Sequence, residues 1–144
     1  MKKLLLCVFS AMILTTSAVS FVSCDDSKED IGRWEKMKWE AVSGQKVQNG
    51  TYQISADGET ITFTCKNYEG PWISDALSGK ESYYLHSEGC EEHRFESDWF
   101  LATMSGNQLR ITFEPNNTSE DRPLELCVTG GDIFHTFKFI QKAK

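Results

Sequence analysis

The stretch "LELCVTGGDIFHTFKFIQ", residues 124–141, decides the fold that we predict for this chain. One face of each of its two arms is mainly apolar, with Leu124, Leu126 and Val128 on the first and His135, Phe137 and Phe139 on the second. Gly130 and Gly131 separate the arms. Alternation with a period of two is typical of a strand that buries one face, so the stretch predicts two β-strands joined by a turn.

The same alternation recurs upstream of this stretch. In "QLRITFEP", residues 108–115, every second residue from Leu109 is apolar, which predicts another strand. In "TYQISADGETITFTC", residues 51–65, two alternating arms flank Asp57-Gly58. This dipeptide favours a tight turn because glycine tolerates positive φ, so we predict a β-hairpin over residues 51–65.

The segment "IGRWEKMKWEAV", residues 31–42, has two readings. Met37, Trp39 and Ala41 have the parity of a strand, whereas other residues of the segment recur at helical spacing. We favour the strand. Several short strands separated by turn signals predict an all-β fold, an antiparallel β-sandwich.

The first 24 residues, "MKKLLLCVFSAMILTTSAVSFVSC", have the layout of a bacterial lipoprotein signal. Two lysines precede a short apolar run, and small residues lead to a cysteine. We therefore predict that residues 1–23 are a signal peptide and that Cys24 is lipidated. The apolar run is shorter than the roughly 20 residues of a membrane-spanning helix.

Residues 24–33 are predicted to form a flexible acidic tether, because "DDSKED" has nothing apolar to bury. Residues 28–30 resemble the surface signal of Bacteroidetes lipoproteins. We therefore expect an outer-membrane lipoprotein that faces either the periplasm or the cell surface. Its expected partners are the membrane, through the lipid anchor, and a glycan or an envelope protein.

The charge of the chain argues against nucleic acid as a partner. The sequence has 15 basic and 21 acidic residues and a net charge of −6. Nucleic-acid backbones require clustered lysine and arginine, so we exclude that partner. Residues 34–144 have the length of one domain.

A family resemblance covers roughly residues 58–141. The runs "TITFTCKNYEGPWIS" (60–74), "SDWFLATMSGNQLRITFEPNNTSEDRPLELCVTGG" (97–131) and "TFKFIQ" (136–141) resemble the BACON domain, which is often found beside carbohydrate-active enzymes. The matching landmarks are Gly70-Pro71-Trp72, Trp99-Phe100, Asn116-Asn117, Thr129-Gly130-Gly131 and Gln141. The resemblance implies an immunoglobulin-like sandwich, a carbohydrate ligand, and core-facing positions for Trp72 and Trp99.

One segment departs from the family pattern. The family has only a few residues between "PWIS" and "SDWF", whereas here "DALSGKESYYLHSEGCEEHRFE", residues 75–96, intervenes. We predict one long inserted loop. Loops of this length in a compact domain are usually functional or disordered.

The insertion contains "LHSEGCEEH", residues 85–93, in which His86, Cys90 and His93 are ligand types that zinc accepts. Structural zinc sites use four ligands in recognisable cysteine and histidine pairs, and this segment would supply nearly all of them alone. We predict a solvated acidic loop with no metal and no cofactor.

Cys65, Cys90 and Cys127 are the cysteines that follow Cys24, and an exported chain meets an oxidising compartment. In the implied immunoglobulin-like sandwich, Cys65 and Cys127 would occupy the strands that a disulfide joins in antibody domains. Parity argues against this pair. Cys65 has the same parity as the inward-facing residues of its strand, whereas Cys127 has the opposite parity to those of its own strand. Either Cys65 is a buried free thiol, or Cys90 fixes the insertion to a strand by a disulfide.

No catalytic motif is recognisable, so we predict that the protein is not an enzyme and has no catalytic residues. Exposed aromatic rings can stack on sugars, and Tyr83, Tyr84 and Trp34 are the predicted carbohydrate-binding residues. The predicted function is a non-catalytic glycan-binding module of the envelope. The alternative is a structural spacer or a protein-interaction component without a small ligand.

Overall fold

The structure is a computed structural model that describes residues 34–42 and 46–144. The predicted signal peptide, the tether and Cys24 lie outside the described residues. Residues 33–144 form one compact unit. The described part of this unit consists of strands and their connections: β1 (Trp39–Ala41), β2 (Val47–Gln48), β3 (Thr51–Ile54), β4 (Glu59–Cys65), β5 (Trp72–Ser78), β6 (Glu81–Tyr84), β7 (Cys90–Glu91), β8 (Arg94–Glu96), β9 (Phe100–Ser105), β10 (Gln108–Phe113), β11 (Arg122–Thr129) and β12 (Phe134–Gln141).

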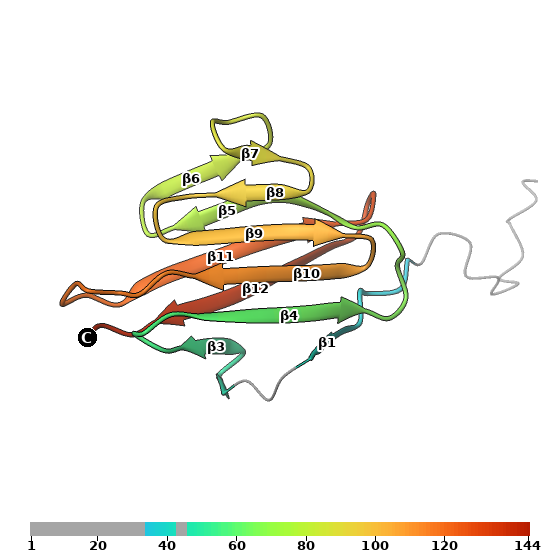
Figure 1. Cartoon of the computed structure of the whole chain (residues 1–144). Helices are drawn as coiled ribbons and strands as arrows, with labels where there is room; N and C mark the ends of the chain where they lie inside the picture. The colour runs from blue at the N-terminus through green and yellow to red at the C-terminus, as the bar shows by residue number, and fades with distance from the viewer. Residues whose placement is uncertain (1–33, 43–45) are drawn as a thin grey trace, which may run out of the picture. The chain divides into compact units, whose positions relative to one another are not determined.

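The strands form two sheets that pack face to face (Figure 1). Sheet 1 has the order β1-β4-β10-β9-β8-β7, and sheet 2 has the order β2-β3-β12-β11-β5-β6. The runs β1-β4-β10-β9 and β12-β11-β5 match the A-B-E-D and G-F-C sheets of an immunoglobulin domain. The predicted all-β, immunoglobulin-like sandwich is therefore confirmed. The pairs are antiparallel except β3 and β12, which run parallel.

The predicted hairpin of residues 124–141 is confirmed as β11 and β12. Leu126 pairs with Phe137, and Leu124 pairs with Phe139. All four of these side chains are buried. The alternation read from the sequence therefore marks the inner face of sheet 2, and the intervening residues form its outer face.

Aromatic side chains join the two sheets in the core. Phe63 of β4 and Phe137 of β12 have ring centroids 4.6 Å apart, and both side chains are at most 1% exposed. Tyr52 of β3 packs edge-on against Phe63 at 5.0 Å, and Phe113 of β10 packs on Phe139 at 5.4 Å. Each fully buried phenylalanine contributes about 1.5–3 kcal/mol by removal from water.

The predicted hairpin over residues 51–65 is wrong. β3 pairs with β2 and β12 in sheet 2, whereas β4 pairs with β1 and β10 in sheet 1. The turn at Asp57-Gly58 therefore takes the chain from one sheet to the other. Gly58 has φ +80°, and a Cβ there would lie 2.4 Å from the carbonyl oxygen of Phe113. The Asp57-Gly58 turn is thus present as predicted. It joins two strands whose apolar sides face each other across the core instead of pairing as a hairpin.

The N-terminal strand prediction is confirmed for residues 39–41, which form β1 on the edge of sheet 1. Met37 is buried, and the Trp39 ring packs on Phe137 at 5.2 Å. Packing against the other sheet explains why strand parity prevails here over helical spacing.

The insertion at residues 75–96 is present, but it is folded into strands rather than a single long loop. It contains most of β5 and all of β6, β7 and β8. β6 extends sheet 2 beyond β5, and the β7–β8 hairpin extends sheet 1 beyond β9. Buried Ala76, Cys90 and Phe95 hold these strands to the core. These strands are short and polar residues surround their few buried positions, so the sequence shows no recognisable apolar alternation in this segment.

Replacing Phe137 with alanine is expected to lower the free energy of unfolding by about 3–5 kcal/mol, because it leaves a cavity at the contact between the sheets. The matched control is Phe134→Ala on the same strand, where the side chain is 63% exposed. The control is expected to change stability by no more than about 0.5 kcal/mol. Urea denaturation followed by tryptophan fluorescence measures both. Equal losses in the two variants would contradict the assigned faces of β12.

Candidate functional site

Residues 85–89 carry the chain from β6 in sheet 2 to β7 in sheet 1, and residues 92 and 93 form the turn between β7 and β8. Backbone hydrogen bonds hold the first segment: the Ser87 N–H donates to the Tyr84 carbonyl at 2.9 Å, and the His86 N–H donates to the Cys90 carbonyl at 3.0 Å. His86 has φ +71°, a conformation uncommon for a residue other than glycine. The motif is thus an ordered crossing between the sheets.

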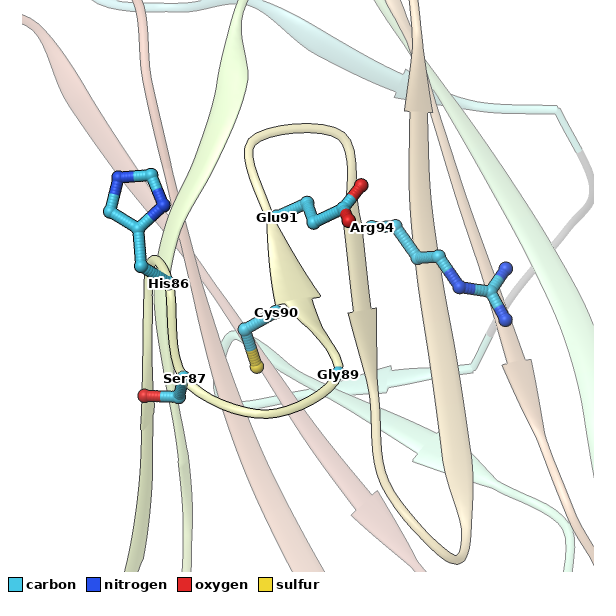
Figure 2. A pocket seen from close by; sticks show the side chains of 6 residues that line it. All are labelled: His86, Ser87, Gly89, Cys90, Glu91 and Arg94. Atoms are coloured by element: carbon cyan, nitrogen blue, oxygen red, sulfur yellow. The ribbon is translucent and has the colours of Figure 1, made fainter.

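The side chains of this crossing do not converge on one point. A hollow of about 340 Å³ is lined by His86, Ser87, Gly89, Cys90, Glu91 and Arg94. Figure 2 shows His86 pointing away from Glu91 and Arg94, which extend toward the same side, and Arg94 forms an ion pair with Glu96 at 2.7 Å. Within residues 34–42 and 46–144, no three histidine, cysteine or acidic side chains gather closely enough to hold a metal ion.

The three described cysteines, Cys65, Cys90 and Cys127, are free thiols. Cys65 and Cys90 are 1% and 2% exposed in the core, and burial raises the pKa of Cys90. Cys127 is half-buried on the outer face of sheet 2. Cys65 and Cys127 therefore lie on opposite faces of their strands, as parity predicted, and the structure agrees with the buried thiol at Cys65.

Tyr83 does not belong to an exposed binding surface, contrary to the prediction. Its ring packs edge-on against Phe100 at 5.5 Å, and its hydroxyl donates to the Glu81 carboxylate at 2.9 Å. Burial and this hydrogen bond raise the pKa of Tyr83. Neighbouring residues of a strand face opposite sides, so Tyr84 lies outward and is 60% exposed.

Trp34 is also exposed, at 64%, but it precedes β1 rather than lying on a sheet face. Hydrogen bonds fix the segment after Trp34 to the residues that follow β4. The Tyr68 hydroxyl donates to the Glu35 carbonyl at 2.6 Å, and the Lys38 N–H donates to Asn67 Oδ1 at 2.9 Å. The structure therefore does not place Trp34 on the strands that carry Tyr84.

Trp72 differs from the position that the family resemblance implied. Ile73 occupies the inner face and is fully buried, so the adjacent Trp72 turns outward and is only half-buried. A β-bulge between β5 and β11 lies directly beyond it, where the register shifts between Cys127 and Val128. Bulges redirect side chains. By contrast, Trp99 packs on Phe100 at 5.3 Å, as expected for a core-facing residue.

Trp72, Tyr84 and Phe134 share the outer face of sheet 2, which we call the aromatic face. Trp72 pairs with Thr129, which pairs with Phe134, so these three residues form one row across β5, β11 and β12. Tyr84 lies in the adjacent row with Asp75 and Cys127. No aromatic ring pair among the described residues involves these three rings. Tyr84 and Phe134 are exposed, whereas Trp72 is half-buried, so the aromatic face presents two open rings and part of a third.

Polar groups surround the rings of the aromatic face. Ser74, at the bulge, donates to the Asp75 carboxylate at 2.8 Å. Lys138 and Glu125 form an ion pair at 2.9 Å on the same face. Sequence reasoning missed Trp72 and Phe134 as site residues. Phe134 had a usable signal, because it is out of phase with the inward series His135, Phe137 and Phe139.

His135 lies on the inner face, behind the aromatic face. Its ring is 4.5 Å from that of Phe137 and 6.2 Å from that of Trp39. Burial among these rings lowers the pKa of His135. A protonated imidazolium is therefore disfavoured in the folded state.

These features define an immunoglobulin-like β-sandwich with an open aromatic face, and its described part contains no helix long and apolar enough to cross a membrane. Neither a protein-family model nor a curated protein matches the chain. An NMR structure of a protein from Bacteroides thetaiotaomicron is similar, with a TM-score of 0.66 and 31% sequence identity. The match covers 77% of this chain and 90% of that protein. The chain belongs to the same family as this Bacteroides protein.

The stability of the fold is expected to fall as the pH drops below about 6.5, the usual pKa of histidine. The unfolded chain binds a proton at His135 that the folded chain resists, so stability is complete above that pH and declines toward the lower folded pKa. Urea denaturation at pH 5 and pH 7 measures the difference. His135→Gln should reduce the difference, while His93→Gln, at an exposed histidine, is the control. An unchanged difference in His135→Gln would show that other groups cause the decline.

Thiol labelling tests the positions of the cysteines. In the fragment 25–144, which lacks Cys24, we expect Cys127 to react with a maleimide while Cys65 and Cys90 react on the order of 100-fold more slowly, because they require local unfolding. The unreduced protein in urea should yield three free thiols. Mass spectrometry identifies the labelled residue. Rapid labelling of Cys65 in the folded protein would contradict the structure.

Proposed function

We propose that this protein is a non-catalytic envelope lipoprotein that binds glycans through the aromatic face. The observation that carries the proposal is that Trp72, Tyr84 and Phe134 project from one open face of sheet 2. Tyr84 and Phe134 are 60% and 63% exposed. Flat aromatic rings cover the apolar faces of sugar rings, and nearby polar groups accept hydrogen bonds from the hydroxyls.

The cellular location of the protein is part of the same proposal. Residues 1–23 would direct export, the lipid on Cys24 would anchor the chain in the outer membrane, and residues 24–33 would serve as a tether. The domain would face the periplasm or the cell surface. The resemblance to BACON domains supports a carbohydrate ligand, and the similarity to a Bacteroides protein is in keeping with a Bacteroidetes envelope.

A second candidate is a protein-interaction component of an envelope complex. The observation in its favour is that Leu77, which is 43% exposed, and the half-buried Ile140 add aliphatic surface to the aromatic face. Contiguous exposed apolar surface also marks protein interfaces. Sugar stacking would use only the rings. Substitution of the rings and substitution of the aliphatic residues therefore distinguish the two candidate functions.

The decisive measurement is binding of the fragment 25–144 to a panel of glycans and polysaccharides. The fragment contains the whole compact unit and its core, so it is expected to fold on its own. Loss of both Trp72 and Phe134 in the double alanine variant should weaken binding by about tenfold or more, since each lost stacking contact contributes roughly 0.5–1.5 kcal/mol. Thermal unfolding confirms that the variant is folded.

Trp34→Ala is the control, because Trp34 is as exposed as Phe134 but lies off the aromatic face. It should bind as the wild-type fragment does. Absence of binding to every glycan of the panel would reject the glycan proposal. Glycan binding that survives in the double variant would keep the function but remove the aromatic face as its site.

A further inference from the structure

We infer that the ligand of the aromatic face is an extended, uncharged, β-1,4-linked polysaccharide that runs across the strands of sheet 2. This inference rests on the proposed function and adds the chemical class and direction of the ligand. It depends on the spacing of two rings, on the residue between them and on the charges around them.

The row that contains Trp72, Thr129 and Phe134 sets the direction of the chain. Trp72 is on β5 and Phe134 is on β12, with β11 between them. Neighbouring strands are about 4.8 Å apart, so the backbone positions of Trp72 and Phe134 are roughly 10 Å apart along the row. This spacing is close to the length of a disaccharide. A sugar chain that lies along the row would therefore place one unit on each ring and a middle unit between them.

Thr129 offers no projecting side chain at the position of the middle unit. Its side chain is only 4% exposed, and its hydroxyl lies 2.7 Å from the Gly131 carbonyl oxygen and 3.0 Å from that of Ile133, to which it donates. The threonine is thus held against the adjacent turn, and its side chain does not project between the two aromatic residues. The middle unit would pass over this position without a stacking partner.

A β-1,4-linked chain in its extended two-fold conformation suits this arrangement, because successive units then turn over and alternate units present the same face. The first and third units would then stack in the same way on Trp72 and Phe134. Helical chains with α-1,4 or β-1,3 linkages do not hold alternate units in one line. Tyr84, in the adjacent row, would contact the side of the chain.

The charges of the aromatic face favour an uncharged ligand. Asp75 lies in the row next to the rings, and the exposed Asp132 lies in the turn that precedes Phe134. Lys138, on the same face, is already engaged by Glu125 at 2.9 Å. Uronate or sulfate groups would therefore meet negative charge and a cation that is already paired.

The test is affinity electrophoresis of the fragment 25–144 in gels that contain galactomannan, xylan, amylose, laminarin or alginate. We expect retardation by the two uncharged β-1,4-linked polysaccharides and none by the α-1,4-linked, β-1,3-linked or acidic ones. Calorimetry with β-1,4-mannose oligosaccharides should show that three units bind about tenfold more tightly than two, because only three units reach both rings. A β-1,4-xylose series is used if xylan alone retards the fragment.

Single variants and a labelling measurement locate the ligand. Trp72→Ala and Phe134→Ala should each remove the advantage of three units over two, while Trp34→Ala keeps it. In the wild-type fragment, bound polysaccharide should slow the alkylation of Cys127, which lies in the row next to Thr129. This second measurement needs no substitution.

The outcomes separate this inference from the proposed function. Binding only to amylose, laminarin or alginate would overturn the inference and leave a glycan module. Tight binding of the disaccharide, or unchanged preference in both single variants, would also overturn it. Absence of binding to every carbohydrate tested would reject both.

Discussion

The contact between Phe63 of β4 and Phe137 of β12 joins the two sheets, and the faces of the surrounding strands follow from it. Because Phe137 points inward, alternation places Phe134 and Thr136 outward on β12. The pairing with β11 then places Thr129 and Cys127 outward, and the next pairing does the same for Trp72 and Asp75. A slip of one residue would turn the aromatic face into the core. The same strand register thus determines which residues form the core and which form the proposed binding surface.

The insertion at residues 75–96 enlarges both sheets without adding a separate core. β6 widens sheet 2 and contributes Tyr84 to the aromatic face, while β7 and β8 widen sheet 1 (Figure 1). The new edges are short, which limits unwanted pairing with other chains. The crossing that carries His86 connects the two sheets at this side of the sandwich, and His93 lies in the turn of the β7–β8 hairpin. The segment richest in histidine, cysteine and acidic residues thus contributes Cys90 to the core, whereas the proposed binding surface consists of aromatic residues.

The sequence predicted the fold better than the site. Long alternation identified β11, β12 and β10, because many residues of one parity are buried together. The turn at Asp57-Gly58 was recognised, but its arms lie in different sheets, since local turn chemistry does not specify which strands pair. Tyr83 and Tyr84 could not be distinguished, because either parity is plausible in a four-residue edge strand. Trp72 faces outward beside a bulge, and such a bulge leaves no pattern in a single sequence.

The parallel pairing of β3 with the C-terminal strand β12 has a mechanical consequence. Opposite pulls on the N-terminal end of β3 and the C-terminal end of β12 act along the strands. Their hydrogen bonds are then strained together in shear, whereas a pull across the strands would open them one after another. The domain therefore resists tension between its two ends with the strand that also carries Phe137 and Phe134.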